Sequence, residues 1–257
     1  MSYVYGFHAV REVLTQHPGR IRSLHYVQGR RDTRVQELIA LAKESGIRFE
    51  AVDKSWLDTR IEGSHQGVAV YCQALTPIDE ETFFFSFETL PKPRLLLVLD
   101  GITDPRNFGA CLRSANGAGV QAVLFPERNS SPVNDVVLKT AAGGAEGLTL
   151  VAVTNLARCL DRLKERGIWL IGTDDQAEQP WFEVDFKGDV AIVMGSEGEG
   201  MRRLTREACD WLVSIPMAGE VSSLNVSVAT GVLLYEVVRQ RSLSAFSVGA
   251  ASQPRSS

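Results

Sequence analysis

The stretch Val190-Ala191-Ile192-Val193-Met194-Gly195-Ser196-Glu197-Gly198-Glu199-Gly200-Met201 joins an apolar segment to a loop in which three glycines surround two carboxylates. A continuous apolar run of this length is typical of a strand buried on both faces of a parallel sheet. Glycine permits positive φ and close approach of the backbone, so the main chain of this loop can line a ligand. Open α/β sheets bind ligands at the carboxyl ends of such strands. The stretch therefore predicts an α/β fold with a site at this strand end.

The glycine spacing argues against two common phosphate-binding loops. Gly195, Gly198 and Gly200 do not match the dinucleotide fingerprint, in which glycines occupy the first, third and sixth positions. The loop also lacks the lysine of a Walker motif. We therefore expect the ligand to be held by something other than its phosphates.

The composition suits a protein of one large domain or two small ones, with 257 residues of which 44% are hydrophobic. There is no apolar run near the roughly 18 residues of a membrane span and no secretory leader, so a cytoplasmic location is expected. Cysteines and histidines show no paired spacing, which favours buried free thiols in a reducing cytosol and no metal site. They are Cys72, Cys111, Cys159, Cys209, His8, His17, His25 and His65.

The charge is unevenly distributed along the chain. The net charge is −4, which argues against non-specific binding of nucleic acid, but residues 1–75 hold ten basic and eight acidic side chains. Five arginines lie close together there, and they form either a solvated face or an RNA contact. They are Arg20, Arg22, Arg30, Arg31 and Arg34.

Residues 1–75 are predicted to form a small α/β unit. The predicted elements are a helix beginning at Ala9–Leu14, strands at Ile21–Val27, Arg48–Val52 and Val68–Cys72, and a helix at Arg34–Ser45 that ends at Gly46. Residues 76–93 are interpreted as a linker, because prolines stand at both of its ends. Four phenylalanines inside this linker, between positions 83 and 87, are expected to pack on one of the domains.

From Leu95 onward apolar strands alternate with helical segments, which predicts a parallel sheet covered on both faces. The predicted strands are Leu95–Leu99, Ala122–Phe125, Thr149–Val153, Trp169–Gly172, Val190–Met194 and Trp211–Ile215. The predicted helices are Phe108–Ala118, Val133–Ala142, Leu156–Arg166, Met201–Ala208 and Leu224–Arg241.

The last of these helices is apolar on most of its circumference, so a partner subunit is a reasonable cover for it. Ser222 or Ser223 is expected to cap it, and Arg239 and Arg241 near its end suit the helix dipole. Residues 244–257 are expected to be disordered, because their composition turns to Ser, Ala, Gly and Pro.

Three polar clusters follow buried strands and are expected at one edge of the sheet. The first holds Asp104, Asn107 and Arg113; turn and capping chemistry explains the first two but not the arginine. The second is the glycine loop with Glu197. The third runs from Ile215 to Asn225 and includes Ser223, which a capping role would explain, whereas Asn225 has low helix propensity.

These clusters resemble the three motifs of the SpoU (TrmH-type) branch of the SPOUT RNA methyltransferases. The matching segments are Asp104-Pro105-Arg106-Asn107-Phe108-Gly109 with Arg113, the loop Met194–Met201, and Ile215–Asn225. Three more segments resemble the subfamily that methylates guanosine riboses of bacterial 23S rRNA. They are Tyr5-Gly6-Phe7-His8-Ala9-Val10, His65-Gln66-Gly67 and Met201–Glu207, so that the resemblance covers residues 3 to about 242.

The resemblance implies a fold and partners that periodicity alone does not. It implies a ribosomal-protein L30e-like RNA-binding domain over residues 1–75 and a methyltransferase domain over residues 94–243, with a trefoil knot at its carboxyl end. It implies S-adenosylmethionine as cofactor, bound through the backbone at Gly195, Ile215, Met217 and Leu224. It also implies a homodimer formed through the knotted domain, and 23S rRNA, near the peptidyl-transferase region, as substrate.

The resemblance assigns activation of the ribose 2′-hydroxyl to Arg113. A guanidinium, with a pKa above ~12, is a poor base, so we interpret Arg113 as stabilising the developing alkoxide. The proton then passes to Glu197, to a phosphate or to water, unless Glu197 only orients Arg113. Asn107 and Asn225 are interpreted as positioning residues, and Ser223 as a donor to the site or a cap.

Two other classes of protein compete with this interpretation. A nicotinamide oxidoreductase would need a glycine fingerprint after the first strand and an acidic residue for the ribose, and both are missing. A non-catalytic rRNA-binding module could use the amino-terminal arginines, but it leaves Arg113, Glu197 and Asn225 unexplained.

Overall fold

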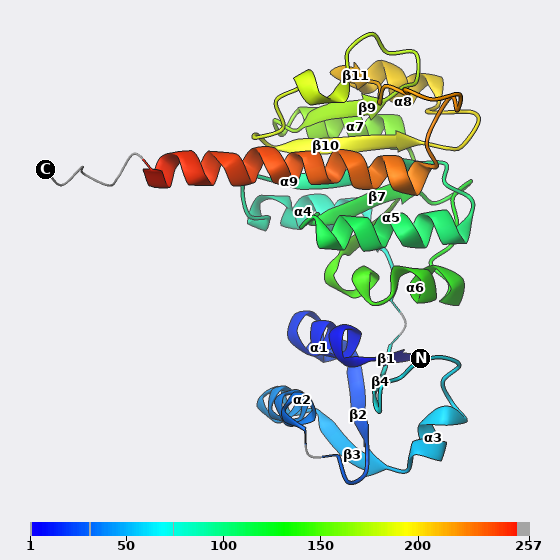
Figure 1. Ribbon diagram of the computed structural model, residues 1–257, viewed down its shortest axis with the longest axis vertical. Coiled ribbons are helices and arrows are strands. Elements are labelled where there is room, and N and C mark those ends of the chain that lie inside the picture. The colour runs from blue at the N-terminus through cyan, green and yellow to red at the C-terminus, as the bar shows by residue number, and fades with distance from the viewer. Residues whose placement is uncertain (1, 31, 74, 251–257) are drawn as a thin grey trace, which may run out of the picture. The chain divides into compact units, whose positions relative to one another are not determined.

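The computed structural model describes residues 2–30, 32–73 and 75–250, and for residues 243–250 it describes the main chain alone. The chain divides into two compact units (Figure 1). One unit reaches Thr76 and also holds Ala142–Gly147; the other holds Pro77–Ala141 and the chain from Leu148 onward. None of the helices described is both long and apolar enough to cross a membrane.

The first unit is a four-stranded sheet in the order β1-β4-β2-β3, in which only β2 and β3 are parallel. Its strands are β1 (Ser2–Tyr5), β2 (Ile21–Val27), β3 (Arg48–Val52) and β4 (Val68–Cys72), and the last three have the predicted bounds. Its helices are α1 (Phe7–Gln16), α2 (Thr33–Glu44) and α3 (Lys54–Asp58). Apolar stripes of α1 and α2 share one core with the sheet, as their helical spacing requires. The sequence analysis missed β1 and α3, which are four and five residues long.

The second unit contains a seven-stranded sheet in the order β11-β9-β10-β6-β7-β8-β5, and every neighbouring pair is parallel. Its strands are β5 (Ile78–Asp79), β6 (Leu95–Asp100), β7 (Ala122–Pro126), β8 (Thr149–Val153), β9 (Trp169–Thr173), β10 (Val190–Gly195) and β11 (Trp211–Val213). The six predicted strands and the predicted parallel sheet are confirmed, although β11 ends two residues early.

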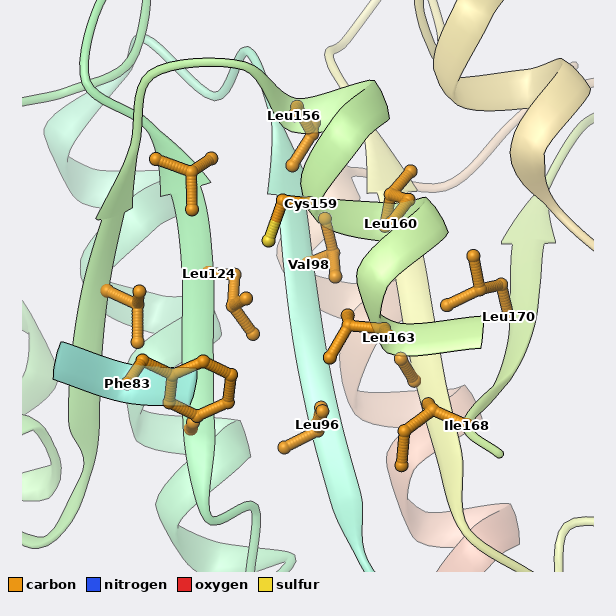
Figure 2. Packing of buried hydrophobic residues seen from close by; sticks show 14 of the residues in the cluster. Phe83, Leu96, Val98, Leu124, Leu156, Cys159, Leu160, Leu163, Ile168 and Leu170 are labelled. Carbon is orange, nitrogen blue, oxygen red and sulfur yellow. The ribbon is translucent and has the colours of Figure 1, made fainter. Parts of the chain in front are cut away.

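Both faces of this sheet carry an apolar core, because alternate residues of each strand point to opposite sides. Even-numbered residues of β6, such as Leu96 and Val98, lie in one cluster with Leu160 and Leu163 of α7 (Leu156–Lys164) (Figure 2). The helices α4 (Glu80–Ser86) and α8 (Arg203–Ala208) border the same cluster. On the other face α5 (Pro105–Gly117) packs against α6 (Asp135–Ala141) and α9 (Val226–Ala250) (Figure 1).

The predicted linker over residues 76–93 is wrong for most of its length. Residues 78 and 79 form the edge strand β5, and α4 follows immediately. Phe83, Phe84 and Phe87 are buried against the sheet, which supplies the apolar contact that turns this segment into part of the second unit. The expectation that the phenylalanines pack on a domain is confirmed for these three, whereas Phe85 is 94% exposed.

The predicted end of the last helix is also wrong. Arg241 donates to the carbonyls of Arg94, Phe186 and Gly188, so it anchors α9 to the sheet instead of ending the helix. The main chain of α9 continues to Ala250, which contradicts disorder beginning at Ser244; alanine in this segment favours helix, and the first proline comes at position 254. The remainder of the expected tail, residues 251–257, lies outside the described residues.

The strand order places a switch point at the centre of the sheet. From β6 the chain moves outward through β7 and β8, then returns so that β10 pairs with the other side of β6. At such a point the connections leave the adjacent strand ends in opposite directions, which opens a crevice at their carboxyl ends. Those ends are Asp100 and Gly195, which are paired directly.

Two phenylalanines of α4 allow a matched test of this core. Phe83 is 1% exposed and Phe85 is 94% exposed, although they are two residues apart on one helix. Phe83→Ala should lower the free energy of unfolding by about 3–5 kcal/mol, because it leaves a cavity in the core. Phe85→Ala should change it by less than about 0.5 kcal/mol. Urea denaturation followed by circular dichroism measures both, and equal losses would contradict the burial of α4.

Candidate active site

Three residues from the three polar clusters meet through one side chain, that of Asn225. Its Nδ2 donates to Oδ1 of Asn107 at 3.0 Å and to Oε1 of Glu197. The same carboxylate oxygen also accepts from the backbone nitrogen of Val226, at 3.4 Å. The amide thus ties the first turn of α5 and the loop after β10 to the start of α9. The three polar clusters therefore meet as predicted, but they do so through Asn107, Glu197 and Asn225 and not through Arg113.

Asn225 also caps α9, and this accounts for an amide at that position. Its Oδ1 accepts from the backbone nitrogen of Ser227 at 2.9 Å and from the Ser227 hydroxyl at 2.6 Å. The backbone carbonyl of Asn225 accepts from Ala229. The expectation that Ser222 or Ser223 caps this helix is wrong, since the helix begins at Val226. The Asn225 side chain therefore caps α9 with its Oδ1 and binds Asn107 and Glu197 with its Nδ2.

Asp104 performs the corresponding task for α5. Its carboxylate accepts from the backbone nitrogen of Arg106 at 2.7 Å, and Pro105 is the first helical residue. The sequence suggested that Asn107 could cap this helix. The structure gives that role to Asp104 instead. The side chain of Asn107 is left free to accept from Asn225.

The glycine loop is a tight turn that presents Glu197. Ser196 and Gly200 exchange two backbone hydrogen bonds of 3.0 Å. Gly198 and Gly200 have φ of 84° and 70°, a region that only glycine adopts readily. A Cβ atom on Gly195 would lie 2.2 Å from the carbonyl carbon of Gly200 and 2.3 Å from the nitrogen of Met201. The two ends of the loop thus touch through their main chains, and only glycine fits there.

A buried carboxylate holds the far end of this loop. Asp100, at the end of β6, is 1% exposed and accepts from the backbone nitrogen of Arg202 at 2.9 Å. Its other oxygen is buried without a hydrogen bond and lies 3.6 Å from Nε of Arg202. The sequence analysis missed this role. The signal was an acidic residue directly at the end of a fully apolar strand.

Arg113 does not join these contacts. It is exposed and makes no hydrogen bond or ion pair within the part of the chain that the structure describes. Six residues of helix rotate a side chain by about 600°, so Arg113 points roughly 120° away from Asn107 around α5. The expected placement of Arg113 by Asn107 and Asn225 is not seen, and Glu197 does not orient it. Ser223 is likewise exposed, and it too has no hydrogen-bond partner among the described residues.

Both units of the chain match known protein families. Residues 94–235 match the model of the SpoU rRNA Methylase family, and residues 3–78 match the model described as RNA 2′-O ribose methyltransferase substrate binding. The chain belongs to the SpoU rRNA methylase family. This confirms the family resemblance and removes the nicotinamide oxidoreductase alternative.

Similar curated proteins span almost the whole chain. One from Pseudomonas syringae pv. tomato, named 23S rRNA (guanosine-2′-O-)-methyltransferase RlmB, is 49% identical over 94% of this chain and 97% of its own length. One of the same name from Ralstonia nicotianae is 50% identical over 93% and 95%. Among solved structures, the SpoU methyltransferase AviRb from Streptomyces viridochromogenes superposes with a TM-score of 0.72 at 26% identity, covering 95% of this chain and 90% of that one.

In this SpoU chain the four predicted cofactor contacts lie on the two loops next to Asn225 and Glu197. Gly195 is buried at the end of β10, and Ile215, Met217 and Leu224 are half-buried between β11 and α9. None of these four residues carries a charged side chain. Among the described residues there is no group of three His, Cys, Asp or Glu side chains that could hold a metal ion.

The cysteines are free, as predicted, and three of the four are buried. Cys111 of α5 lies beside the site, 3.5 Å from the hydroxyl of Thr230. Burial raises the pKa of Cys111 to about 11, with a smaller upward effect from Glu197. At neutral pH this group is therefore a thiol and not a nucleophile.

The amino-terminal arginines predicted to bind RNA do not share one environment. Arg20 is engaged by the buried carboxylate of Glu146 at 2.6 Å and by the carbonyl of Gln73 at 2.8 Å, which is a structural role. Arg22 is exposed on β2, and Arg34 is exposed on α2. Arg30 pairs with Asp32 at 2.9 Å. Arg31 lies outside the described residues.

The contact at Gly195 gives a test of the loop. Gly195→Ala should lower the free energy of unfolding by about 3 kcal/mol or more, because its methyl group meets main-chain atoms that cannot rotate away. Gly188→Ala is the matched control, since a Cβ atom there meets nothing within 4 Å. Thermal unfolding of both variants measures the difference. Equal stability would mean that the loop does not close against β10.

Proposed function

We propose that this protein transfers a methyl group from S-adenosylmethionine to the ribose 2′-oxygen of a guanosine in 23S rRNA, in the peptidyl-transferase region, in the cytoplasm. The observation that carries the proposal is the hydrogen-bonded set of Asn107, Glu197 and Asn225 at the central strand ends. The names of relatives about 49% identical over nearly the whole chain support the substrate. The non-catalytic alternative offers no reason for such a polar set beside a glycine-lined loop.

The loops beside Glu197 fit S-adenosylmethionine. When bound, this cofactor supplies an electrophilic methyl group on a sulfonium. Gly195 allows main-chain atoms to approach a ligand without a side chain, and Ile215, Met217 and Leu224 offer apolar atoms for the methionine and adenine parts. An apolar surrounding excludes water from the reacting atoms. The trefoil knot implied by the family is part of this proposal, and the contact of Asn225 with Glu197 is consistent with it.

Arg113 activates the ribose oxygen in this proposal. Its guanidinium has no acidic partner among the described residues, so its charge is available to a phosphate or to an oxygen that loses its proton. A cation near a developing alkoxide stabilises the charge where it forms. The guanidinium keeps its own proton at neutral pH and therefore acts electrostatically.

Glu197 offers one acceptor for the proton. Its Oε1 accepts from Asn225 and Val226, while Oε2 has no hydrogen bond among the described residues. The competing acceptors are a phosphate of the RNA and water. Because Oε1 is held by two donors, the orientation of Oε2 is set by the start of α9.

The test is transfer of labelled methyl to 23S rRNA from cells lacking this gene, with mapping of the modified ribose. Arg113→Ala should lower the transfer rate at least 100-fold, because the alkoxide loses its cation, while calorimetry should give unchanged S-adenosylmethionine affinity. Arg158→Ala is the control: it removes an exposed arginine from α7, on the opposite face of the sheet. Loss of cofactor binding in Arg113→Ala would make this residue structural. A wild-type protein that binds rRNA without transferring methyl would overturn the proposal.

Glu197→Gln then separates the proton acceptors. Glutamine retains an acceptor for Asn225 but cannot take a proton. A rate loss at least tenfold, with cofactor affinity retained, assigns the proton to Glu197. An unchanged rate assigns it to phosphate or water.

A homodimer is part of the proposal, and α9 offers the surface for it. Val228 and Tyr235 are 52% and 54% exposed and stand seven residues apart, on the same side of the helix. An exposed apolar stripe on a helix of this kind is typical of a subunit interface. Tyr235→Asp should shift the protein from dimer to monomer in sedimentation equilibrium. Phe182→Asp, also at a 54% exposed position, should not; a monomeric wild type would contradict the dimer.

A further inference from the structure

A cavity of about 620 Å³ lies in the first unit, and no residue of the three polar clusters lines it. Two motifs from the sequence analysis line it: Phe7 of the segment Tyr5–Val10, and His65-Gln66-Gly67 before β4. Arg30, Arg34 and Lys54 complete its cationic wall. The volume is in the range of small-molecule pockets, roughly 300–1,000 Å³. The methyl-transfer site makes no use of these residues.

The wall of the cavity is held in shape by hydrogen bonds between the two motifs. His65 is 6% exposed; its Nδ1 accepts from the nitrogen of Gly67, and its Nε2 lies 2.9 Å from Oδ1 of Asp58. Gln66 has a φ of 54°, and its side-chain oxygen accepts from the nitrogen of Phe7 at 3.1 Å. Arg30 donates to the carbonyl of Gln66. A preorganised wall of this kind reduces the entropy lost when a ligand binds.

The cavity combines an aromatic ring with three cations, two of which have no carboxylate partner among the described residues. The guanidinium carbons of Arg30 and Arg34 lie 5.2 Å and 5.8 Å from the centre of the Phe7 ring. Arg30 is neutralised by Asp32. Arg34 and Lys54 are exposed, and neither has an ion pair within the part of the chain that the structure describes. The lining therefore offers a flat π surface beside two free positive charges.

This combination matches the chemistry of one unpaired nucleotide. Bases that are splayed out of single-stranded loops stack on aromatic rings and on guanidinium planes, and their phosphates bind arginine and lysine. A base inside a duplex is already stacked and paired, so neither of its faces is available to the Phe7 ring. A simple phosphate-binding patch would need the cations but not the aromatic ring beside them.

We propose that this cavity holds one unpaired nucleotide of the RNA substrate, with its base against Phe7 and Arg34 and its phosphate at Arg34 and Lys54. The inference rests on the proposed function, since it takes the bound RNA to be the methylation substrate. It adds that the first unit recognises an unpaired nucleotide in a loop or bulge of the RNA and does not recognise a duplex.

Fluorescence anisotropy with a labelled RNA hairpin carrying an unpaired loop, and with the same sequence in a full duplex, tests the proposal. Phe7→Leu keeps apolar volume but loses the ring, so it should weaken hairpin binding about tenfold and leave duplex binding unchanged. Lys54→Gln should weaken binding and reduce the slope of log affinity against log salt by about one. Lys43→Gln removes a charge from α2 outside the cavity and should change neither.

The exposed position of Arg34 provides a variant that does not threaten folding. Arg34→Gln should abolish the fluorescence quenching that a 2-aminopurine in the hairpin loop shows on stacking, and circular dichroism checks the fold of every variant. Hairpin affinity of Phe7→Leu equal to wild type, or equal weakening toward hairpin and duplex, would overturn the proposal.

Methyl transfer distinguishes a failure of this inference from a failure of the proposed function. With the cavity variants, KM for rRNA should rise while kcat and S-adenosylmethionine affinity stay unchanged. If the wild type transfers no methyl group, the proposed function fails, but the anisotropy experiment still reports on the cavity. If transfer occurs and KM does not change in Phe7→Leu, the cavity is not a nucleotide site.

Discussion

The close approach of main chain to main chain at Gly195 is the contact on which the site depends. β10 ends there, directly opposite the end of β6, and the loop folds back so that Gly200 and Met201 touch the strand end. The carboxylate of Asp100 then holds the next residue, Arg202, from the neighbouring strand. Since no side chain fits between these segments, the loop has one closed form, and Glu197 is presented at its tip. A lone carboxylate on an open loop would have no defined position.

Asn225 couples the carboxyl-terminal helix to that loop. An amide can donate and accept at once, and this one uses its oxygen to cap α9 and its nitrogen to bind Asn107 and Glu197. An aspartate could cap the helix but could not donate to Glu197, and a serine is too short to bridge three segments. The position of α9 on the sheet and the geometry of the site are therefore linked. Arg241, further along the same helix, secures that position through four backbone carbonyls, those of Pro93, Arg94, Phe186 and Gly188.

The two units present different chemistry to their ligands. In the second unit, backbone contacts and the amide of Asn225 fix the carboxylate of Glu197 beside a glycine loop. In the first unit, cations surround an aromatic ring, which suits a polyanion with planar bases. Arg20 shows that positive charge alone does not indicate RNA contact, because its guanidinium forms an ion pair with buried Glu146. Arg34 and Lys54 differ from it in having no acidic partner among the described residues.

Local pattern determined the class of the fold and the family. Apolar runs such as Leu95–Leu99 and Val190–Met194 predict buried parallel strands because burial on both faces requires apolar residues throughout. The motifs around Asn107, Glu197 and Asn225 were sufficient for the family, because they are short segments of fixed spacing. The helix α4 was missed because the prolines on either side of it and the acidic residues of its first turn resemble a linker, until the sheet buries Phe83 and Phe84.

Tertiary structure alone decided which of the candidate residues meet. Asn107 and Asn225 are 118 positions apart, and their contact depends on how α5 and α9 pack. The sequence predicted Arg113 beside them, but the rotation of α5 turns its side chain to another side. The cavity between Phe7, Arg34 and His65 was equally invisible, because a hollow exists only where separate segments fail to fill space. Spacing along a chain specifies local geometry, whereas long-range contacts follow from the packing of whole elements.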